Sequence, residues 1–405
     1  MKIAIIVPWY DKDMSYIENC LPKALASLGH EVHLMTSSMP QPRPGSMLEQ
    51  RSTAYSRTAS SGQAFRKPPG DPGASVKVHV LPHRMLNNRY VLLRHVIPTM
   101  REVMPDIIQT ITLADPIAWC AALAALLLRV PLFVGNHNPS RKGTRLPLLG
   151  PRLSAVVRRL GAIPASVVAT KCYAVTGEAA RDAVTVFGLQ SSKVVVAPLG
   201  TDTTIFYPAS SDSKTRVDIR AGLGYQEQDV VCVYSGRLTP AKNPLALAKA
   251  VSTLRRAGLR IFGLFIGDGE EAAAIRREPG CTLLPYVSAP TLADYYRASD
   301  LAVWPRSMSS SQLDALACGL PTIVQAGLTK RELFESGAIG YNGSNPDSLV
   351  ESIRSVAQTL SWHKNRQLSQ VELIRQKYSW LALARQRVCD YEVAVQLARS
   401  KPRLL

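Results

Sequence analysis

Short apolar runs alternate with longer helix-like stretches along most of this chain. Apolar runs of about 4–8 residues are typical of strands buried on both faces, and helices between them allow parallel pairing. The pattern therefore predicts an α/β fold with two doubly wound, Rossmann-like sheets, for which 405 residues are enough. The predicted strands lie at residues 2–8, 31–36, 76–81, 105–110, 131–135, 171–176, 193–197, 229–235, 260–266, 281–285, 300–304 and 321–325.

The pattern breaks at residues 200–215, where Gly200 and Pro208 are followed by a polar run. We expect an N-terminal domain over residues 1–205, a second domain over 206–375, and a C-terminal helix over 376–405. Residues 38–75 are rich in Ser, Gly, Pro and Arg without periodicity, which predicts a flexible insertion in the first domain.

The run SGRLTPAKN at residues 235–243 lies between a predicted strand and a helix-like run that begins at Pro244. Gly236 allows a close backbone turn, and Arg237 and Lys242 flank the helix start. Such a turn suits a diphosphate, because a helix N-terminus and two cations attract negative charge. A solvated strand-to-helix turn explains the run equally well by itself. The run DALACGLP at residues 314–321 favours the phosphate interpretation.

Together these two runs resemble the retaining GT-B glycosyltransferases of family 4, over nearly the whole chain. In that family a GR-x4-K loop binds the donor diphosphate, and a later E-x7-E segment contacts the donor sugar and ribose. Arg237 and Lys242 match the loop, and Asp314 stands at the second glutamate. The resemblance implies two domains facing across a cleft, with the last helix crossing back to the first domain. It also implies that residues 1–205 bind the acceptor and residues 206–375 bind the nucleotide sugar.

The resemblance also implies a function: retaining, metal-independent transfer of a sugar from a nucleotide diphosphate donor to a lipid-linked or polysaccharide acceptor, as in cell-envelope glycan synthesis. The class would be a hexosyltransferase with no cofactor besides the donor substrate. Arg237 and Lys242 would neutralise the leaving diphosphate, and Asp314 would bind the ribose. His137 resembles the family histidine that reaches the donor sugar.

Further donor contacts follow from the same resemblance. Gly267 and Gly269 match the family's GxGxE turn, and Tyr286 stands where the family binds the base. An ordinary turn explains the two glycines as well. On the acceptor side, Asp13, Ser15 and Tyr16 follow the first strand, where the family usually has paired glycines. Asp13 also belongs to a lone D-x-D run without the surroundings of a metal site, so we predict no metal.

One departure from the family pattern is chemically large. Arg306 stands where the first glutamate belongs, and it cannot accept hydrogen bonds from sugar hydroxyls. The donor sugar could be acidic, with Arg306 as its counter-ion, or Ser309, Ser310 and Ser311 could recognise the sugar hydroxyls. In the third alternative the protein binds or senses a nucleotide sugar with reduced or lost catalysis. A nicotinamide-dependent oxidoreductase ranks far lower, since no GxGxxG follows the first strand.

The charge of the chain predicts an anionic partner. Lys and Arg number 48 against 30 Asp and Glu, and no carboxylate occurs between Asp115 and Glu178. The stretch 141–160 mixes leucine and valine with arginine, which suits an anionic membrane surface or, equally, a core-facing helix with a basic outer side. Nucleic acid is disfavoured because no recognition module is present.

We expect a cytoplasmic protein, peripheral on the inner face of the membrane. No signal peptide begins the chain, and the long apolar run at 116–134 contains Arg129 and Pro131, which predicts a buried helix and a strand rather than a membrane span. The seven cysteines form no CxxC pair and suit core positions in a reducing compartment.

Overall fold

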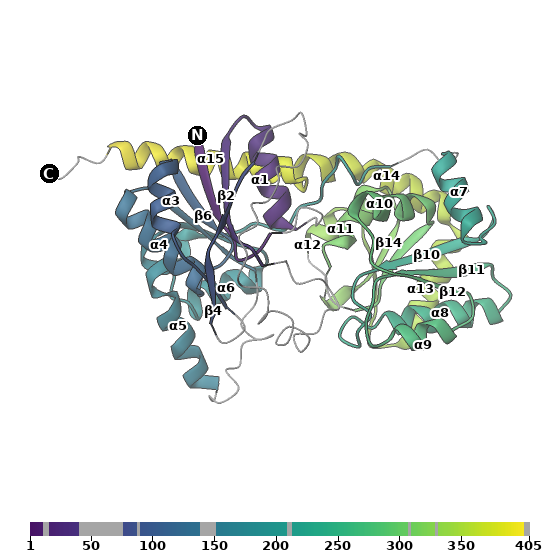
Figure 1. Ribbon diagram of the computed structural model, residues 1–405. Helices are drawn as coiled ribbons and strands as arrows, with labels where there is room; N and C mark the ends of the chain where they lie inside the picture. The colour runs from purple at the N-terminus through teal and green to yellow at the C-terminus, as the bar shows by residue number, and fades with distance from the viewer. Residues whose placement is uncertain are drawn as a thin grey trace. The chain divides into compact units, whose positions relative to one another are not determined.

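The structure is a computed structural model that describes residues 1–10, 16–39, 76–86, 90–137, 151–208, 213–306, 309–328 and 331–400. The chain forms two compact units (Figure 1). The first contains the described residues up to Leu199 together with those from Trp380 onward, and the second contains those from Gly200 to Ser379. The predicted insertion at 38–75 lies outside the described residues except for residues 38 and 39.

The first unit is built on a parallel sheet of seven strands in the order β3-β2-β1-β6-β7-β8-β9. Each pairing in this sheet is parallel, as the buried apolar runs predict. A separate antiparallel hairpin is formed by β4 and β5. The strands are β1 (Lys2–Ile6), β2 (Glu31–Ser37), β3 (Lys77–Leu81), β4 (His83–Leu86), β5 (Tyr90–Leu93), β6 (Ile107–Thr110), β7 (Leu132–Asn136), β8 (Ala169–Ala174) and β9 (Val194–Val196).

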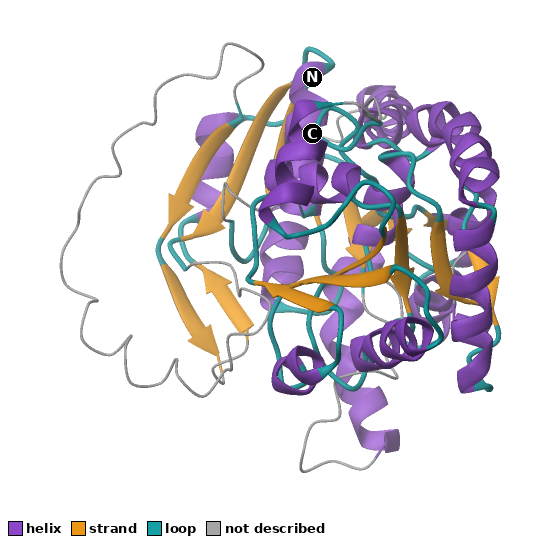
Figure 2. Ribbon diagram, turned by 90° about the vertical axis from the view of Figure 1, so that its right-hand side faces the viewer, coloured by secondary structure: helices purple, strands orange, loops and turns teal. Residues whose placement is uncertain are grey.

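Helices cover both faces of this sheet (Figure 2). Because alternate residues of a strand point to opposite faces, Ile3 and Ile5 pack in the core beneath α1 and α15, whereas Ala4 and Ile6 pack in the core beneath the other helices. The last helix, α15 (yellow in Figure 1), runs beside the first helix, α1 (purple), although the two are far apart in the sequence. The helices are α1 (Ile17–Ser27), α3 (Val96–Val103), α4 (Pro116–Leu128), α5 (Pro151–Val168), α6 (Gly177–Thr185) and α15 (Trp380–Ser400).

The second unit contains a parallel sheet of six strands in the order β12-β11-β10-β13-β14-β15. Its strands are β10 (Val230–Ser235), β11 (Ile261–Ile266), β12 (Cys281–Leu284), β13 (Leu301–Trp304), β14 (Thr322–Gln325) and β15 (Ile339–Tyr341). Its helices are α7 (Lys214–Gly222), α8 (Pro244–Arg256), α9 (Ala272–Arg277), α10 (Ala289–Ala298), α11 (Ser311–Ala317), α12 (Arg331–Glu335), α13 (Pro346–Gln358) and α14 (Leu360–Lys377).

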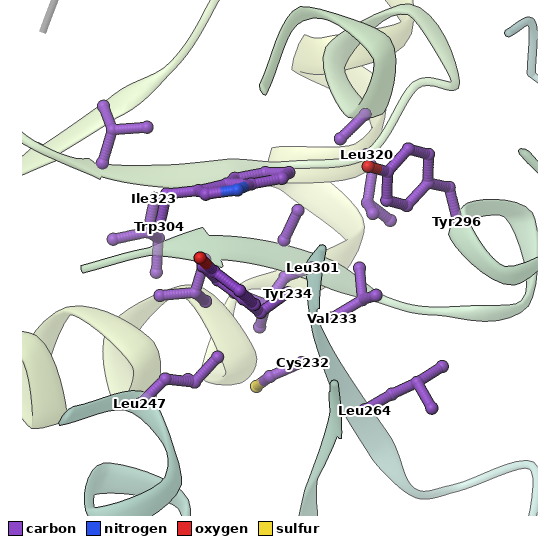
Figure 3. Packing of buried hydrophobic residues seen from close by; sticks show 14 of the residues in the cluster. Cys232, Val233, Tyr234, Leu247, Leu264, Tyr296, Leu301, Trp304, Leu320 and Ile323 are labelled. Atoms are coloured by element: carbon purple, nitrogen blue, oxygen red, sulfur yellow. The ribbon is translucent and has the colours of Figure 1, made fainter. Parts of the chain in front are cut away.

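One continuous hydrophobic core fills the second unit. Its largest buried side chains include Tyr234 on β10 and Trp304 on β13, whose ring centroids lie 6.2 Å apart, and Tyr296 on α10 (Figure 3). A buried ionic cluster lies at the amino end of β13, directly before its first residue. There the carboxylate of Asp300 contacts Arg216, Arg220 and Lys364 at 2.7–2.9 Å.

The predicted α/β class with two Rossmann-like sheets is confirmed, and each predicted strand is present within two residues of its expected bounds. The prediction missed the β4–β5 hairpin and β15. It was also wrong in one respect about the run at 116–134, because α4 is not fully buried: Trp119, Leu123, Leu126 and Leu127 are exposed. In the part of the chain that the structure describes, no helix is long and apolar enough to span a membrane.

Candidate functional site

The predicted donor residues follow adjacent strands of the second sheet. The strands β11, β10 and β13 are neighbours and parallel, so the loops after Ile266, Ser235 and Trp304 emerge at one edge. Ligands of doubly wound sheets bind at the carboxyl ends of the strands. This edge is therefore the candidate site.

Two of these loops are joined by backbone hydrogen bonds. The N–H of Gly236 donates to the carbonyl of Ile266 at 3.0 Å, and the N–H of Leu238 donates to that of Asp268 at 2.9 Å. Gly267 and Gly269 permit this approach: at φ 145° and 153°, an added Cβ would lie 2.0 Å from the oxygen of Gly236 and 2.4 Å from that of Leu238. Packing of the two loops is thus sufficient reason for these glycines, and their predicted contact with the donor stays a prediction.

The predicted phosphate cations stand on this joined pair of loops. Arg237 is exposed, and its carbonyl accepts a hydrogen bond from the hydroxyl of Tyr234 at 3.0 Å. The N–H of Lys242 donates to the carbonyl of Thr239, and Asn243 adopts a left-handed conformation directly before α8. The chain thus turns from β10 into α8 with both cations close to the helix start, as the spacing predicts.

A carboxylate that the sequence interpretation did not assign also lies at this helix start. Glu271 accepts a hydrogen bond from the N–H of Leu245 at 3.2 Å, in the first turn of α8. Its own N–H donates to the carbonyl of Leu238. The amino end of α8 therefore already binds one anionic group. The sequence signal was the GxGxE match itself: with Gly267 and Gly269 as its glycines, its glutamate is Glu271, which was not assigned a contact.

Buried hydroxyls and an indole anchor the end of β10. The Ser235 Oγ and the Tyr296 hydroxyl lie 2.6 Å apart, and the Trp304 Nε1–H donates to the Ser235 carbonyl at 3.1 Å. All three residues are buried, and Figure 3 shows Trp304 along its strand and Tyr296 extending from a helix. Buried polar groups that are satisfied in this way fix the strand end from which the loop departs.

Asp314 lies in the first turn of α11, where it accepts a hydrogen bond from the Thr201 hydroxyl at 2.6 Å. Burial raises the pKa of Asp314 to about 7; the Thr201 hydrogen bond opposes this shift, and the charge of Asp202 adds to it. A carboxyl with this pKa is partly protonated at neutral pH. Thr201 was not predicted as a partner, because it lies 113 residues away in sequence.

The serine loop precedes the same helix. The N–H of Ser309 donates to the side-chain oxygen of Gln312 at 3.1 Å, Ser310 is exposed, and Ser311 begins α11. Arg306 is exposed at the end of β13. Next to it, the carbonyl of Pro305 accepts a hydrogen bond from the Tyr341 hydroxyl.

Tyr286 is exposed in the loop after β12, which pairs with β11. The second unit thus brings the predicted donor residues to the carboxyl edge of one sheet. They are Gly236, Arg237, Lys242, Gly267, Gly269, Tyr286, Ser309, Ser310, Ser311 and Asp314.

The remaining predicted residues belong to the first unit. His137 directly follows β7 and is partly buried, and Tyr16 directly precedes α1. Asp13 and Ser15 lie outside the described residues. An unassigned carboxyl stands in the first turn of α1: Glu18 is 8% exposed, its Oε2 has no hydrogen-bond partner, and burial raises its pKa.

Metal ligands were also sought. Over the described ranges, no three His, Cys, Asp or Glu side chains are placed to hold a metal ion. The D-x-D run at 11–13 lies outside these ranges, so metal independence stays a prediction.

Known structures share this architecture. The sucrose-phosphate synthase of Thermosynechococcus elongatus superposes with a TM-score of 0.66 at 17% identity, over 99% of this chain and 100% of the other. Anabaena HepE in complex with UDP-glucose gives a TM-score of 0.66 at 15% identity over 97% and 100%, and WaaG, a glycosyltransferase involved in lipopolysaccharide biosynthesis, gives 0.61 at 14% over 98% and 99%. The chain therefore has the GT-B fold.

Models of known protein families match both halves of the chain. The model for Glycosyltransferase Family 4 matches residues 21–205, and that for Glycosyl transferases group 1 matches residues 229–359. The two matches cover different parts of the chain, and together they identify it as a glycosyltransferase of the kind that the resemblance in the sequence predicts.

The curated relatives of this chain include several D-inositol 3-phosphate glycosyltransferases. The D-inositol 3-phosphate glycosyltransferase of Geodermatophilus obscurus is 28% identical over 56% of this chain and 54% of the relative. That of Arthrobacter sp. is 26% identical over 80% and 76%. The chain spans about half the length of the first relatives it matches.

Proposed function

We propose that the protein is a retaining, metal-independent glycosyltransferase that uses a nucleotide diphosphate sugar and delivers the sugar to a lipid-linked or polysaccharide acceptor. The observation that carries the proposal is the pair of joined loops at the edge of the second sheet, with Arg237 and Lys242 beside the start of α8. Two cations at a helix N-terminus stabilise the charge that develops on a departing diphosphate. The family match supports the same chemistry.

Each remaining residue has a proposed role. The carboxylate of Asp314 accepts hydrogen bonds from ribose hydroxyls, and Tyr286 contacts the base. The serine loop, Ser309 to Ser311, recognises the sugar together with His137, whose imidazole can also stabilise positive charge near the anomeric carbon. UDP-glucose in the HepE structure and the name of the curated relatives suggest two members of the test panel, a uridine donor and a phosphorylated cyclitol acceptor.

Transfer assays with a matched lysine variant test the proposal. The full-length protein is assayed with UDP-, GDP- and ADP-sugars against lipid-linked, oligosaccharide and inositol phosphate acceptors. Lys242→Ala should lower kcat/KM by at least about 100-fold, because removal of a transition-state charge contact typically costs ~3 kcal/mol. Lys249→Ala, on an exposed position of the same helix, should leave turnover unchanged. Full activity of Lys242→Ala would refute the assigned role.

A second candidate function rests on Arg306, which replaces the carboxylate of the family pattern. In that case the protein binds a nucleotide sugar without transferring it. Calorimetry separates the two functions: donor binding that depends on Lys242, with no product on any acceptor, favours the binding protein. Product formation with an acidic donor sugar alone would instead assign Arg306 as the counter-ion of that sugar.

A further inference from the structure

An apolar surface is exposed on the first unit along α4 and α5. On α4 the residues that point outward are all large and apolar: Trp119, Leu123, Leu126 and Leu127, which are 41–60% exposed. The outward side of α5 is also mostly apolar over its described side chains, with Val156, Val157, Leu160, Ile163 and Val167 at 41–71% and Arg159 exposed among them. Polar residues normally occupy the outer side of a surface helix.

The two helices present these side chains as one surface. They pack against each other, and the Trp119 Nε1–H donates to the carbonyl of Gly161. A Cβ added at Gly161 would lie 3.8 Å from the Trp119 ring, an ordinary van der Waals distance, so the ring packs directly on the α5 backbone. Single exposed apolar residues are normal on a soluble protein, but a continuous group of nine marks an interaction site. We name these nine residues the α4–α5 face.

The segment of the sequence that carries the face has charges of one sign. From residue 116 to residue 177 the sequence contains eight Lys and Arg and no Asp or Glu. Of these cations, Arg129 at the end of α4 and Arg159 on α5 are exposed. Lys171 pairs with Asp390 at 2.5 Å and does not contribute a free charge.

We propose that the α4–α5 face docks on an anionic lipid bilayer. The apolar side chains would enter the boundary between headgroups and acyl chains, where tryptophan is favoured, and the arginines would meet lipid phosphates. A second copy of the chain fits less well, because a symmetric pair would bring two carboxylate-free faces together. The docking adds to the proposed glycosyl transfer and does not depend on it.

Flotation of the full-length protein with lipid vesicles tests the proposal without any turnover. We expect binding to vesicles of phosphatidylcholine and phosphatidylglycerol (about 7:3) at low salt, weaker binding at high salt, and little binding to phosphatidylcholine alone. Leu123→Glu with Leu127→Glu should lower the partition coefficient at least about tenfold. Arg129→Gln with Arg159→Gln should lower it roughly fivefold per charge on anionic vesicles.

The matched control is Val393→Glu with Leu397→Glu, the same spacing and substitution on exposed positions of α15, which packs on the other side of the sheet. This variant should bind like the wild type. A second readout keeps the test independent of folding: brominated lipid should quench the tryptophan fluorescence of the wild type more than that of Trp119→Phe.

Two results would overturn the proposal: absence of vesicle binding at low salt, or an equal loss of vesicle binding in the two double-glutamate variants. A dimer in light scattering that Leu123→Glu with Leu127→Glu converts to a monomer would assign the face to a second copy instead.

Discussion

Asp314→Asn should make the protein more stable at neutral and alkaline pH. Burial raises the pKa of Asp314 from 3.8 to about 7, so the folded protein resists losing this proton. Between these two pKa values the unfolded chain is ionised while the folded chain still holds the proton. Stability therefore falls as pH rises from about 4 to about 7, and it no longer changes through this group at higher pH. The asparagine variant lacks this slope but can still accept the Thr201 hydrogen bond.

The size of the effect follows from the shift. At about 1.36 kcal/mol per pH unit, ionising Asp314 in the folded protein costs up to ~4 kcal/mol. The residue is only partly buried, so water reduces the penalty, and we expect roughly 2–4 kcal/mol. Thr201→Val is a useful companion, because removal of the hydroxyl that stabilises the carboxylate should extend the slope to higher pH.

Urea unfolding of wild type and Asp314→Asn from pH 4.5 to 8.5 measures this difference. The stability gap should widen up to about pH 7 and then remain constant; a gap independent of pH would refute the reasoning. Ligand binding supplies a second measurement. If ribose hydroxyls donate to the carboxylate, nucleotide affinity should rise up to about tenfold per pH unit below pH 7 and level off above it, and Asp314→Asn should remove this dependence.

Three further predictions concern stability. Gly267→Ala should cost at least about 3 kcal/mol, since its φ suits glycine and the new Cβ would lie 2.0 Å from a backbone oxygen, whereas Gly222→Ala, with open space around it, should be near neutral; thermal unfolding compares the two. Asp300→Asn should cost about 3–5 kcal/mol in urea titrations at pH 7. Burial raises the pKa of Asp300, but its cationic neighbours and the N–H of Val231 lower it further than burial raises it, so the penalty should shrink as acid protonates the wild-type carboxylate. Glu18→Gln should stabilise the protein increasingly as pH rises through the raised pKa of this carboxyl, and a constant difference across that range would show an ordinary, solvated Glu18.

Most of the fold was predictable because parallel strands that are buried on both faces leave continuous apolar runs in the sequence. The strands that escaped give a weaker signal. In the hairpin, β4 has no fully buried residue and β5 is an apolar run of only four residues, and β15 has three residues including Gly340. The exposed side of α4 could not be predicted for a different reason. The helix is apolar on all its sides, and such a sequence predicts a fully buried helix.

The candidate site was predictable only where its residues are close in sequence. The loop with Arg237 and Lys242 and the run that includes Asp314 each carry a local pattern. The contact between Thr201 and Asp314 joins distant segments, and the interaction of Glu271 with α8 depends on how two loops pack. Tertiary contacts of this kind leave no periodicity or spacing in the chain, so Thr201 could not be found from the sequence, and the GxGxE run marked Glu271 without showing its contact with α8.

These tertiary contacts also determine what a ligand can gain at the site. The N–H groups of Gly236 and Leu238 already donate to the neighbouring loop, and that of Leu245 already donates to Glu271. A diphosphate at this edge would therefore gain less from these backbone donors than an open helix N-terminus offers, and more from side chains. Since Arg237 is exposed and its backbone is held by Tyr234, loss of its charge should leave the loops in place. The side-chain variants thus report on ligand binding, whereas the glycine variants report on the packing that positions the cations.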